Sequence, residues 1–253
     1  MHERSIDIGT ADGAMETFIT HPETGGPFAA VIVYMDIWGV REELYDIARR
    51  IASVGYCGIV PDLYYREGKK RFDTMGPDGK SLSVHLLDAA VRDEAVAVSR
   101  RLTDAMAIRD TSAIIQFLSG EAQISTAAMG GVGYCMGGRQ VVAVAGHIRG
   151  FRATMSLHGT NLVTDGEDSP HLLAPKIAGE IYCGFGSKDS FAPPELIAAM
   201  EAAFVGAEAQ YRYRVHADAD HGYALPDRDI HHKQAANRDW EVFFPMLRRQ
   251  IGS

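Results

Sequence analysis

Cys135 stands in the segment Gly133-Tyr134-Cys135-Met136-Gly137, which has the spacing of a nucleophile turn between a strand and a helix. The nucleophile of such a turn has strained backbone angles, and side chains two residues to either side would collide, so both positions require glycine. A helix that begins here points free N–H groups at the sulfur, and the N–H of Met136 becomes half of an oxyanion hole. The segment therefore predicts that Cys135 is a covalent nucleophile. A buried cysteine in a dinucleotide-binding turn is the alternative, but the G-x-G-x-x-G pattern is absent.

An acid and a base follow Cys135 in the chain order that this type of turn requires. Asp189 lies in a glycine-rich loop after an expected strand, and His221 lies in a loop after the penultimate expected element. We therefore predict a triad of Cys135, His221 and Asp189. Alternatives remain open: Asp189 could cap the following helix, His216 is a second candidate for the base, and the run 216–221 could bind a metal. No H-E-x-x-H motif supports the metal alternative.

The loop after the first central strand supplies further groups for the expected site. It reads Met35-Asp36-Ile37-Trp38-Gly39, and this loop usually provides the second N–H of the oxyanion hole, here that of Ile37. Asp36 would place a second carboxylate near the thiol of Cys135. A carboxylate beside a thiol disfavours the thiolate, so Asp36 is expected to modulate the nucleophile, with a role as a loop-capping acceptor as the alternative.

Large aromatic side chains lie in or near the loops at the expected mouth of the site: Trp38, Tyr64, Tyr65 and Tyr223. They predict a partly apolar substrate pocket. Ordinary packing within the loops explains them equally well.

The elements that would position these residues alternate between strand and helix. An opening hairpin is expected at 4–20, and the apolar, β-branched run 28–34 is typical of a strand covered on both faces. Further strands are expected at 56–60, 127–134, 153–157, 177–185 and 211–215, and helices at 40–51, 84–105, 109–119, 136–147, 194–204 and 233–250. This order predicts an α/β fold with a mostly parallel central sheet, helices on both faces and an antiparallel N-terminal hairpin. Ligands bind such sheets at the carboxyl ends of the strands.

The length, the net charge and the cysteine count limit the class of protein. The 253 residues suit a single α/β domain over 1–253, and 33 acidic against 25 basic residues give a net charge of −8. That balance argues against a nucleic-acid partner. No signal peptide or membrane-length apolar run is found, and the three cysteines do not suggest a disulfide framework, so we expect a cytoplasmic protein that acts on a small molecule. The oligomeric state is not predicted.

With these residues placed, the chain resembles the dienelactone hydrolase family of α/β-hydrolases over nearly its whole length. The segments that match are 34–39, 55–63, 133–138, 186–189 and 219–223. The resemblance implies a hydrolase of carboxylic ester bonds like carboxymethylenebutenolidase, with Cys135 as nucleophile, His221 as base, Asp189 as orienting acid and no metal or organic cofactor. At the position of Asp36 the family has a glutamate that holds the thiol neutral until substrate binds.

One departure concerns the substrate. The founding enzymes bind the carboxylate of dienelactone with arginines, one of them at the position of Leu225. We therefore expect neutral aryl esters or lactones to be accepted at least as well as anionic ones. The predicted function is a cysteine-dependent lactone or ester hydrolase that forms a Cys-acyl intermediate. The alternatives are a general carboxylesterase or thioesterase on the same triad, a non-catalytic protein that binds a small molecule, and a thiol redox protein.

Overall fold

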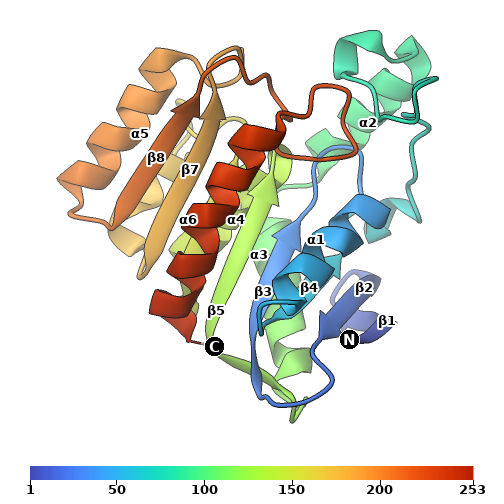
Figure 1. Ribbon diagram of the computed structural model, residues 1–253, viewed down its shortest axis with the longest axis vertical. Coiled ribbons are helices and arrows are strands. Elements are labelled where there is room, and N and C mark those ends of the chain that lie inside the picture. The colour runs from blue at the N-terminus through green and yellow to red at the C-terminus, as the bar shows by residue number, and fades with distance from the viewer. Residues whose placement is uncertain (253) are drawn as a thin grey trace.

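An eight-stranded sheet forms the centre of the computed structural model, which describes residues 1–252 (Figure 1). Its strand order is β1-β2-β4-β3-β5-β6-β7-β8. The pairs β1·β2 and β2·β4 are antiparallel, and every later pair is parallel. The strands are β1 (His2–Thr10), β2 (Gly13–His21), β3 (Phe28–Tyr34), β4 (Cys57–Pro61), β5 (Ile124–Tyr134), β6 (Phe151–Leu157), β7 (Glu180–Gly186) and β8 (Tyr211–His216). The predicted hairpin and mostly parallel sheet are therefore confirmed.

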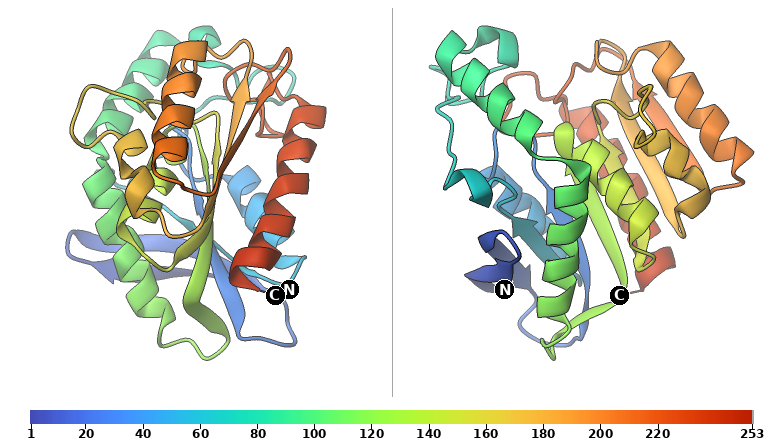
Figure 2. Two further views of the ribbon diagram at one scale, coloured as in Figure 1. Left: turned by 90° about the vertical axis from the view of Figure 1, so that its left-hand side faces the viewer. Right: turned by 180° about the vertical axis from the view of Figure 1, so that it is seen from behind.

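The central strands are buried because helices cover both faces of the sheet. In Figure 1, α1 (Glu42–Ala52) and α6 (Lys233–Ile251) lie in front of the sheet. Figure 2 shows α3 (Asp104–Leu118), α4 (Met136–His147) and α5 (Pro194–Gly206) on the opposite face. With both faces covered, β7 is buried along its whole length, which explains its continuous apolar sequence.

The region between β4 and β5 differs from the sequence-based expectation. The first helix there, α2, spans Ala89–Arg101, and α3 begins at Asp104, so the break comes earlier than predicted. The hydroxyl of Thr103 causes it, because this side chain accepts a hydrogen bond from the N–H of Met106 at 3.3 Å and caps α3. A 3₁₀ helix at Pro170–Lys176 was not predicted from the sequence.

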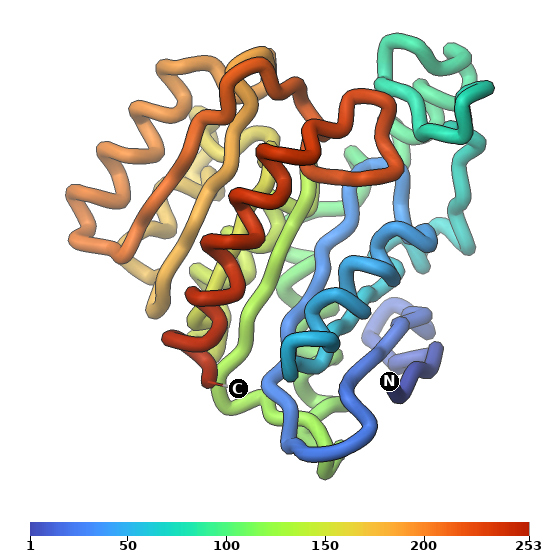
Figure 3. The backbone as a smooth tube through the Cα atoms, in the orientation of Figure 1, coloured from blue at the N-terminus to red at the C-terminus, as the bar shows by residue number. Residues whose placement is uncertain are grey.

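The loops that follow the parallel strands lie at one edge of the sheet (Figure 3). The long segment between β4 and α2 crosses this edge and contacts the loop after β8, where the N–H of Ser81 donates to the carbonyl of Asp227 at 2.7 Å. This edge therefore has loops from both halves of the sheet around it. No helix in residues 1–252 is long and apolar enough to cross a membrane.

Candidate active site

Cys135 occupies the turn between β5 and α4 with φ 55° and ψ −116°. An L-residue adopts this conformation only when its surroundings hold it there. The flanking glycines are required by space, because a methyl group on Gly133 would collide with the backbone of Gly137, and one on Gly137 would collide with the carbonyl of Tyr34. The predicted nucleophile turn is thus present, and Cys135 is 9 % exposed.

His158, which the sequence analysis did not single out, supports this turn. It follows β6, it is fully buried, and its Nδ1 accepts a hydrogen bond from the backbone N–H of Cys135 at 3.2 Å. Burial lowers the pKa of His158 well below its usual range, so the ring is neutral and can act as an acceptor. The ring also packs edge-on against His221, with 5.2 Å between the ring centroids. His158 therefore contacts both the backbone of the nucleophile and the ring of the candidate base.

His221 and Asp189, the predicted base and acid, are hydrogen-bonded to each other. Nδ1 of His221 lies 2.8 Å from Oδ2 of Asp189, and Oδ1 of Asp189 accepts the N–H of Phe191 at 2.8 Å. The Asp189 side chain is fully buried and that of His221 is 19 % exposed. Phe191, another residue missed in the sequence, packs its ring against His221 with 4.7 Å between the centroids.

The charge of Cys135 acts on the imidazole of His221. Burial lowers the pKa of His221, but the negative charge of Cys135 and the hydrogen bond to Asp189 outweigh it and raise the pKa to about 10. At neutral pH the imidazole therefore carries its proton. The arrangement can hold a thiolate–imidazolium pair, which is the reactive form of a cysteine nucleophile.

Cys135 and His221 line one cavity of about 470 Å³. Ile37 and Met136 line it too, and in residues 1–252 neither of their backbone N–H groups donates to a protein acceptor. Two free donors beside a nucleophile are what an oxyanion hole requires. Trp38 also lines the cavity, as predicted from the sequence.

The other three predicted pocket aromatics do not line this cavity, which corrects the prediction. Tyr64 is buried beneath it and donates its hydroxyl to the carbonyl of Ile37 at 3.2 Å. Tyr65 bonds to Asp110 at 3.0 Å, and Tyr223 is fully buried with its hydroxyl on Asp239 at 2.6 Å. Their phenol groups pair with acceptors inside the protein, so loop packing explains all three.

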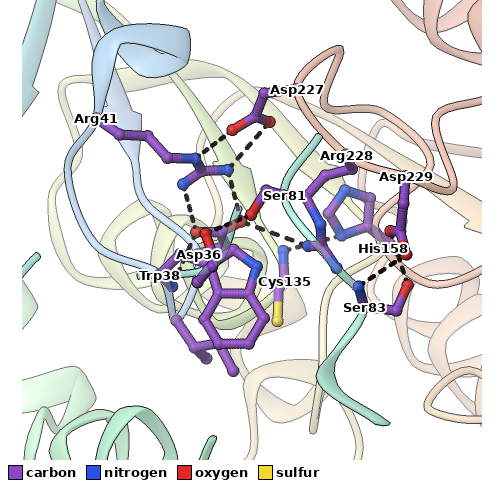
Figure 4. A network of polar contacts seen from close by, with 12 residues as sticks. Asp36, Trp38, Arg41, Ser81, Ser83, Cys135, His158, Asp227, Arg228 and Asp229 are labelled. Carbon is purple, nitrogen blue, oxygen red and sulfur yellow. Dashed lines mark hydrogen bonds and ion pairs between the residues drawn. The ribbon is translucent and has the colours of Figure 1, made fainter. Parts of the chain in front are cut away.

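Asp36 lines the same cavity as Cys135, and its carboxylate has partners that the sequence did not reveal. Both of its oxygens accept from Arg41, at 2.7 and 3.0 Å, and Oδ1 also accepts the N–H of Trp38 at 3.0 Å. Figure 4 shows dashed lines from Asp36 to Arg41 and to Arg228, whose Nη1 lies 3.8 Å away. The carboxylate is thus a loop-capping acceptor with arginine partners, so we expect it to affect the thiol less than an unpaired carboxylate would.

Arg228 brings a cation into the cavity that the sequence analysis did not predict. It is 6 % exposed, its guanidinium makes no hydrogen bond in the described chain, and it lies 5.5 Å from the centroid of the Trp38 ring. The residues on either side of Arg228 are held by hydrogen bonds to other segments. Asp227 accepts one from Nε of Arg41 at 2.5 Å, and Asp229 accepts one from the hydroxyl of Ser83 at 2.8 Å. Leu225, at the family's arginine position, is instead part of the core.

His216 does not take the place of His221. Its Nε2 lies 2.7 Å from Asp239 in a fully buried pair, and it does not line the cavity. The metal alternative for 216–221 also loses its geometric basis, because the two histidines point to different carboxylates. Across residues 1–252, no three side chains of the His, Cys, Asp or Glu type form a metal-binding group.

The mostly parallel sheet with its N-terminal hairpin, and the strained strand-to-helix turn at its carboxyl edge, define an α/β-hydrolase fold. A model of the dienelactone hydrolase family matches residues 15–251, so the chain belongs to that family, whose members act on carboxylic ester bonds. A relative from Methylorubrum extorquens with the name "Putative carboxymethylenebutenolidase" is 26 % identical over 240 residues, which are 93 % of this chain and 77 % of the relative. A relative of the same name from Escherichia coli K12 is 27 % identical, over 91 % and 80 % of the two chains. The crystal structure of a dienelactone hydrolase homologue from Klebsiella pneumoniae superposes with a TM-score of 0.82 at 23 % identity, over 97 % of each chain.

The first prediction concerns the charge pair. Removing the imidazolium with His221→Gln should slow alkylation of Cys135 by iodoacetamide at pH 7 by about tenfold or more, because the thiolate loses its counter-charge. The rate should recover at high pH, where the thiol ionises without help. For the wild type, the contribution of the imidazolium should be present below pH 10 and lost as the pH rises through the pKa of His221. The measurement is the alkylation rate against pH, followed by mass spectrometry of the Cys135 peptide.

The same measurement tests the effect of Asp36 on the thiol. Asp36→Asn should leave the alkylation profile close to that of wild type, since Arg41 already balances the carboxylate. It should instead lower the free energy of unfolding by about 2 kcal/mol, because part of a buried ion pair is lost. Faster alkylation in a folded Asp36→Asn variant would mean that Asp36 restrains the thiol after all.

Proposed function

We propose that this protein hydrolyses a carboxylic ester or lactone through a covalent acyl intermediate on Cys135. The observation that carries the proposal is the cavity itself, where a cysteine in a strained nucleophile turn meets a histidine that is bonded to a buried aspartate at 2.8 Å. A structural cysteine needs none of these features. A thiol redox role is less well supported, because Cys57 and Cys183 are both buried in the core and neither lines the cavity.

The proposed reaction begins with the thiolate of Cys135. Its sulfur adds to the carbonyl carbon, and the N–H groups of Ile37 and Met136 donate to the oxyanion that forms. The C–O bond of the ester or lactone then breaks, and Nε2 of His221 gives its proton to the leaving oxygen. The neutral imidazole next takes a proton from water, which attacks the thioester, releases the acid and regenerates the thiolate–imidazolium pair. Asp189 holds the ring in the required tautomer throughout.

The surroundings of Arg228 indicate which charge the substrate carries. A buried guanidinium without a hydrogen bond is unfavourable unless an anionic group can complete its coordination. Asp36 is too far to do so, at 3.8 Å, and is already shared with Arg41. We infer that Arg228 binds a carboxylate of the substrate. This inference reverses the expectation that neutral esters are accepted at least as well as anionic ones, which depended on Leu225.

A hydrolysis screen tests the proposed chemistry. Cys135→Ala should reduce the kcat/KM for lactones and aryl esters by about a thousandfold or more, because the group that forms the covalent bond is lost. Cys183→Ala is the matched control, since this cysteine is buried in β7 and does not line the cavity. Retention of most of the activity in a folded Cys135→Ala variant would contradict the role of Cys135.

A paired substrate comparison tests Arg228. In wild type, an ester with a free carboxylate in its acyl part should be hydrolysed faster than its methyl-ester counterpart. Arg228→Leu should lower kcat/KM for the anionic member by about tenfold or more and change the neutral member little. Arg109→Leu removes an exposed arginine outside the cavity and serves as the control. Equal losses for both members would contradict a carboxylate-binding role.

A further inference from the structure

One wall of the cavity is not used by the proposed mechanism. It is formed by α4, the junction between α2 and α3, and the loop after β6, with Thr103, Gln140, Thr160 and Asn161 among its residues. Arg139 also lies here, but its charge is already paired: Nε lies 2.8 Å from Asp104, and Nη1 donates to the carbonyl of Asn161. The arginine next to Gln140 is therefore paired, while Arg100, an exposed residue near the end of α2, lines the same cavity without an ion pair in the described chain.

Gln140 is the unexplained residue of this wall. Its side chain is 1 % exposed, and neither its amide nitrogen nor its amide oxygen has a hydrogen-bond partner in the described chain. Buried amide groups almost always have hydrogen-bond partners, so an amide whose nitrogen and oxygen both lack one needs an explanation. Gln140 stands one helical turn after Met136 on α4, and both residues line the cavity. The unpaired amide of Gln140 thus lies on the same face of α4 as Met136, whose N–H is the predicted oxyanion donor.

We propose that Gln140 is a specificity-determining residue that binds an uncharged polar group of the substrate. A carboxamide offers a donor and an acceptor, so it can pair with a hydroxyl or another carboxamide. It provides no charge, and the neighbouring Arg139 is neutralised by Asp104, so Gln140 itself does not favour an anion as Arg228 does. The substrate class is an ester or lactone that carries a hydroxyl or carboxamide group apart from the scissile bond. This inference rests on the proposed hydrolase function.

Two matched ester pairs test this assignment. One pair varies the alcohol part, para-(hydroxymethyl)phenyl acetate against para-ethylphenyl acetate, and the other varies the acyl part, phenyl ω-hydroxyhexanoate against phenyl heptanoate. Each pair replaces a hydroxyl with a methyl group of similar size. In at least one pair, wild type should prefer the hydroxyl member in kcat/KM by about tenfold or more, because a site built to bind a hydroxyl rejects the analogue without one. Gln140→Met keeps the length and helix propensity of the side chain and should abolish this preference.

The control is Gln234→Met, the same substitution on an exposed position of α6 outside the cavity, which should leave both ratios unchanged. Unchanged ratios in Gln140→Met, or no preference in wild type for either pair, would overturn the proposal. A general packing defect would slow both members of a pair equally and leave their ratio unchanged, so it also counts against the proposal.

A binding measurement separates this test from the proposed reaction. Ketones in which a methylene group replaces the ester oxygen of the same pairs can be titrated into Cys135→Ala, with the fluorescence of Trp38 as the signal. The hydroxylated ketone should bind more tightly, and adding Gln140→Met should remove the difference. If Cys135→Ala still hydrolyses esters, the proposed function fails while this difference remains measurable. If the ketones bind equally, the inference about Gln140 fails by itself.

Discussion

The strained backbone of Cys135 is the constraint on which the rest of the site depends. A positive φ at a residue other than glycine costs about 1–3 kcal/mol and persists only where several contacts enforce it. Here the N–H of Cys135 donates to the carbonyl of Leu157 at 3.1 Å and to Nδ1 of His158 at 3.2 Å, both from β6 or its end. Gly133 and Gly137 allow the close approach of β5, α4 and β3. Since these contacts come from the centre of the sheet, they tie the backbone of Cys135 directly to the core.

A network of charges extends this order from the sulfur to the surrounding loops. Arg41 joins Asp36 to Asp227 and thereby connects the loop after β3 to the loop after His221. The two carboxylates satisfy Arg41, so Arg228 is left as the cation without a hydrogen bond. The network thus fixes the loops and leaves the guanidinium of Arg228 at the cavity without a hydrogen bond in residues 1–252, with a single ion pair to Asp36 at 3.8 Å. A buried guanidinium that lines the cavity and makes no hydrogen bond is suited to a substrate that brings its own negative charge.

Much of the fold and the contact between His221 and Asp189 could be predicted from the sequence, because local patterns indicate them. The strand 28–34 and the helix 136–147 have the predicted bounds, since an apolar run and a glycine-flanked turn are local signals. The signals that were missed depend on tertiary contacts. Nothing near Arg228 shows that its neighbours are anchored to distant segments, and nothing near Tyr223 shows that its hydroxyl turns inward to Asp239. The start of α3 was predictable, because Thr103 is a good N-cap residue, but the apolar periodicity was given more weight.

The central claim is that an acyl group is transferred to the sulfur of Cys135, and trapping that species tests it most directly. Wild type mixed with an aryl ester, quenched in acid within the first turnovers and digested, should yield the peptide that contains Cys135 with the mass of one added acyl group. Treatment with hydroxylamine at neutral pH should remove the group, as expected for a thioester. The acyl mass on another residue, or ester hydrolysis that proceeds without any acylated peptide, would contradict the account.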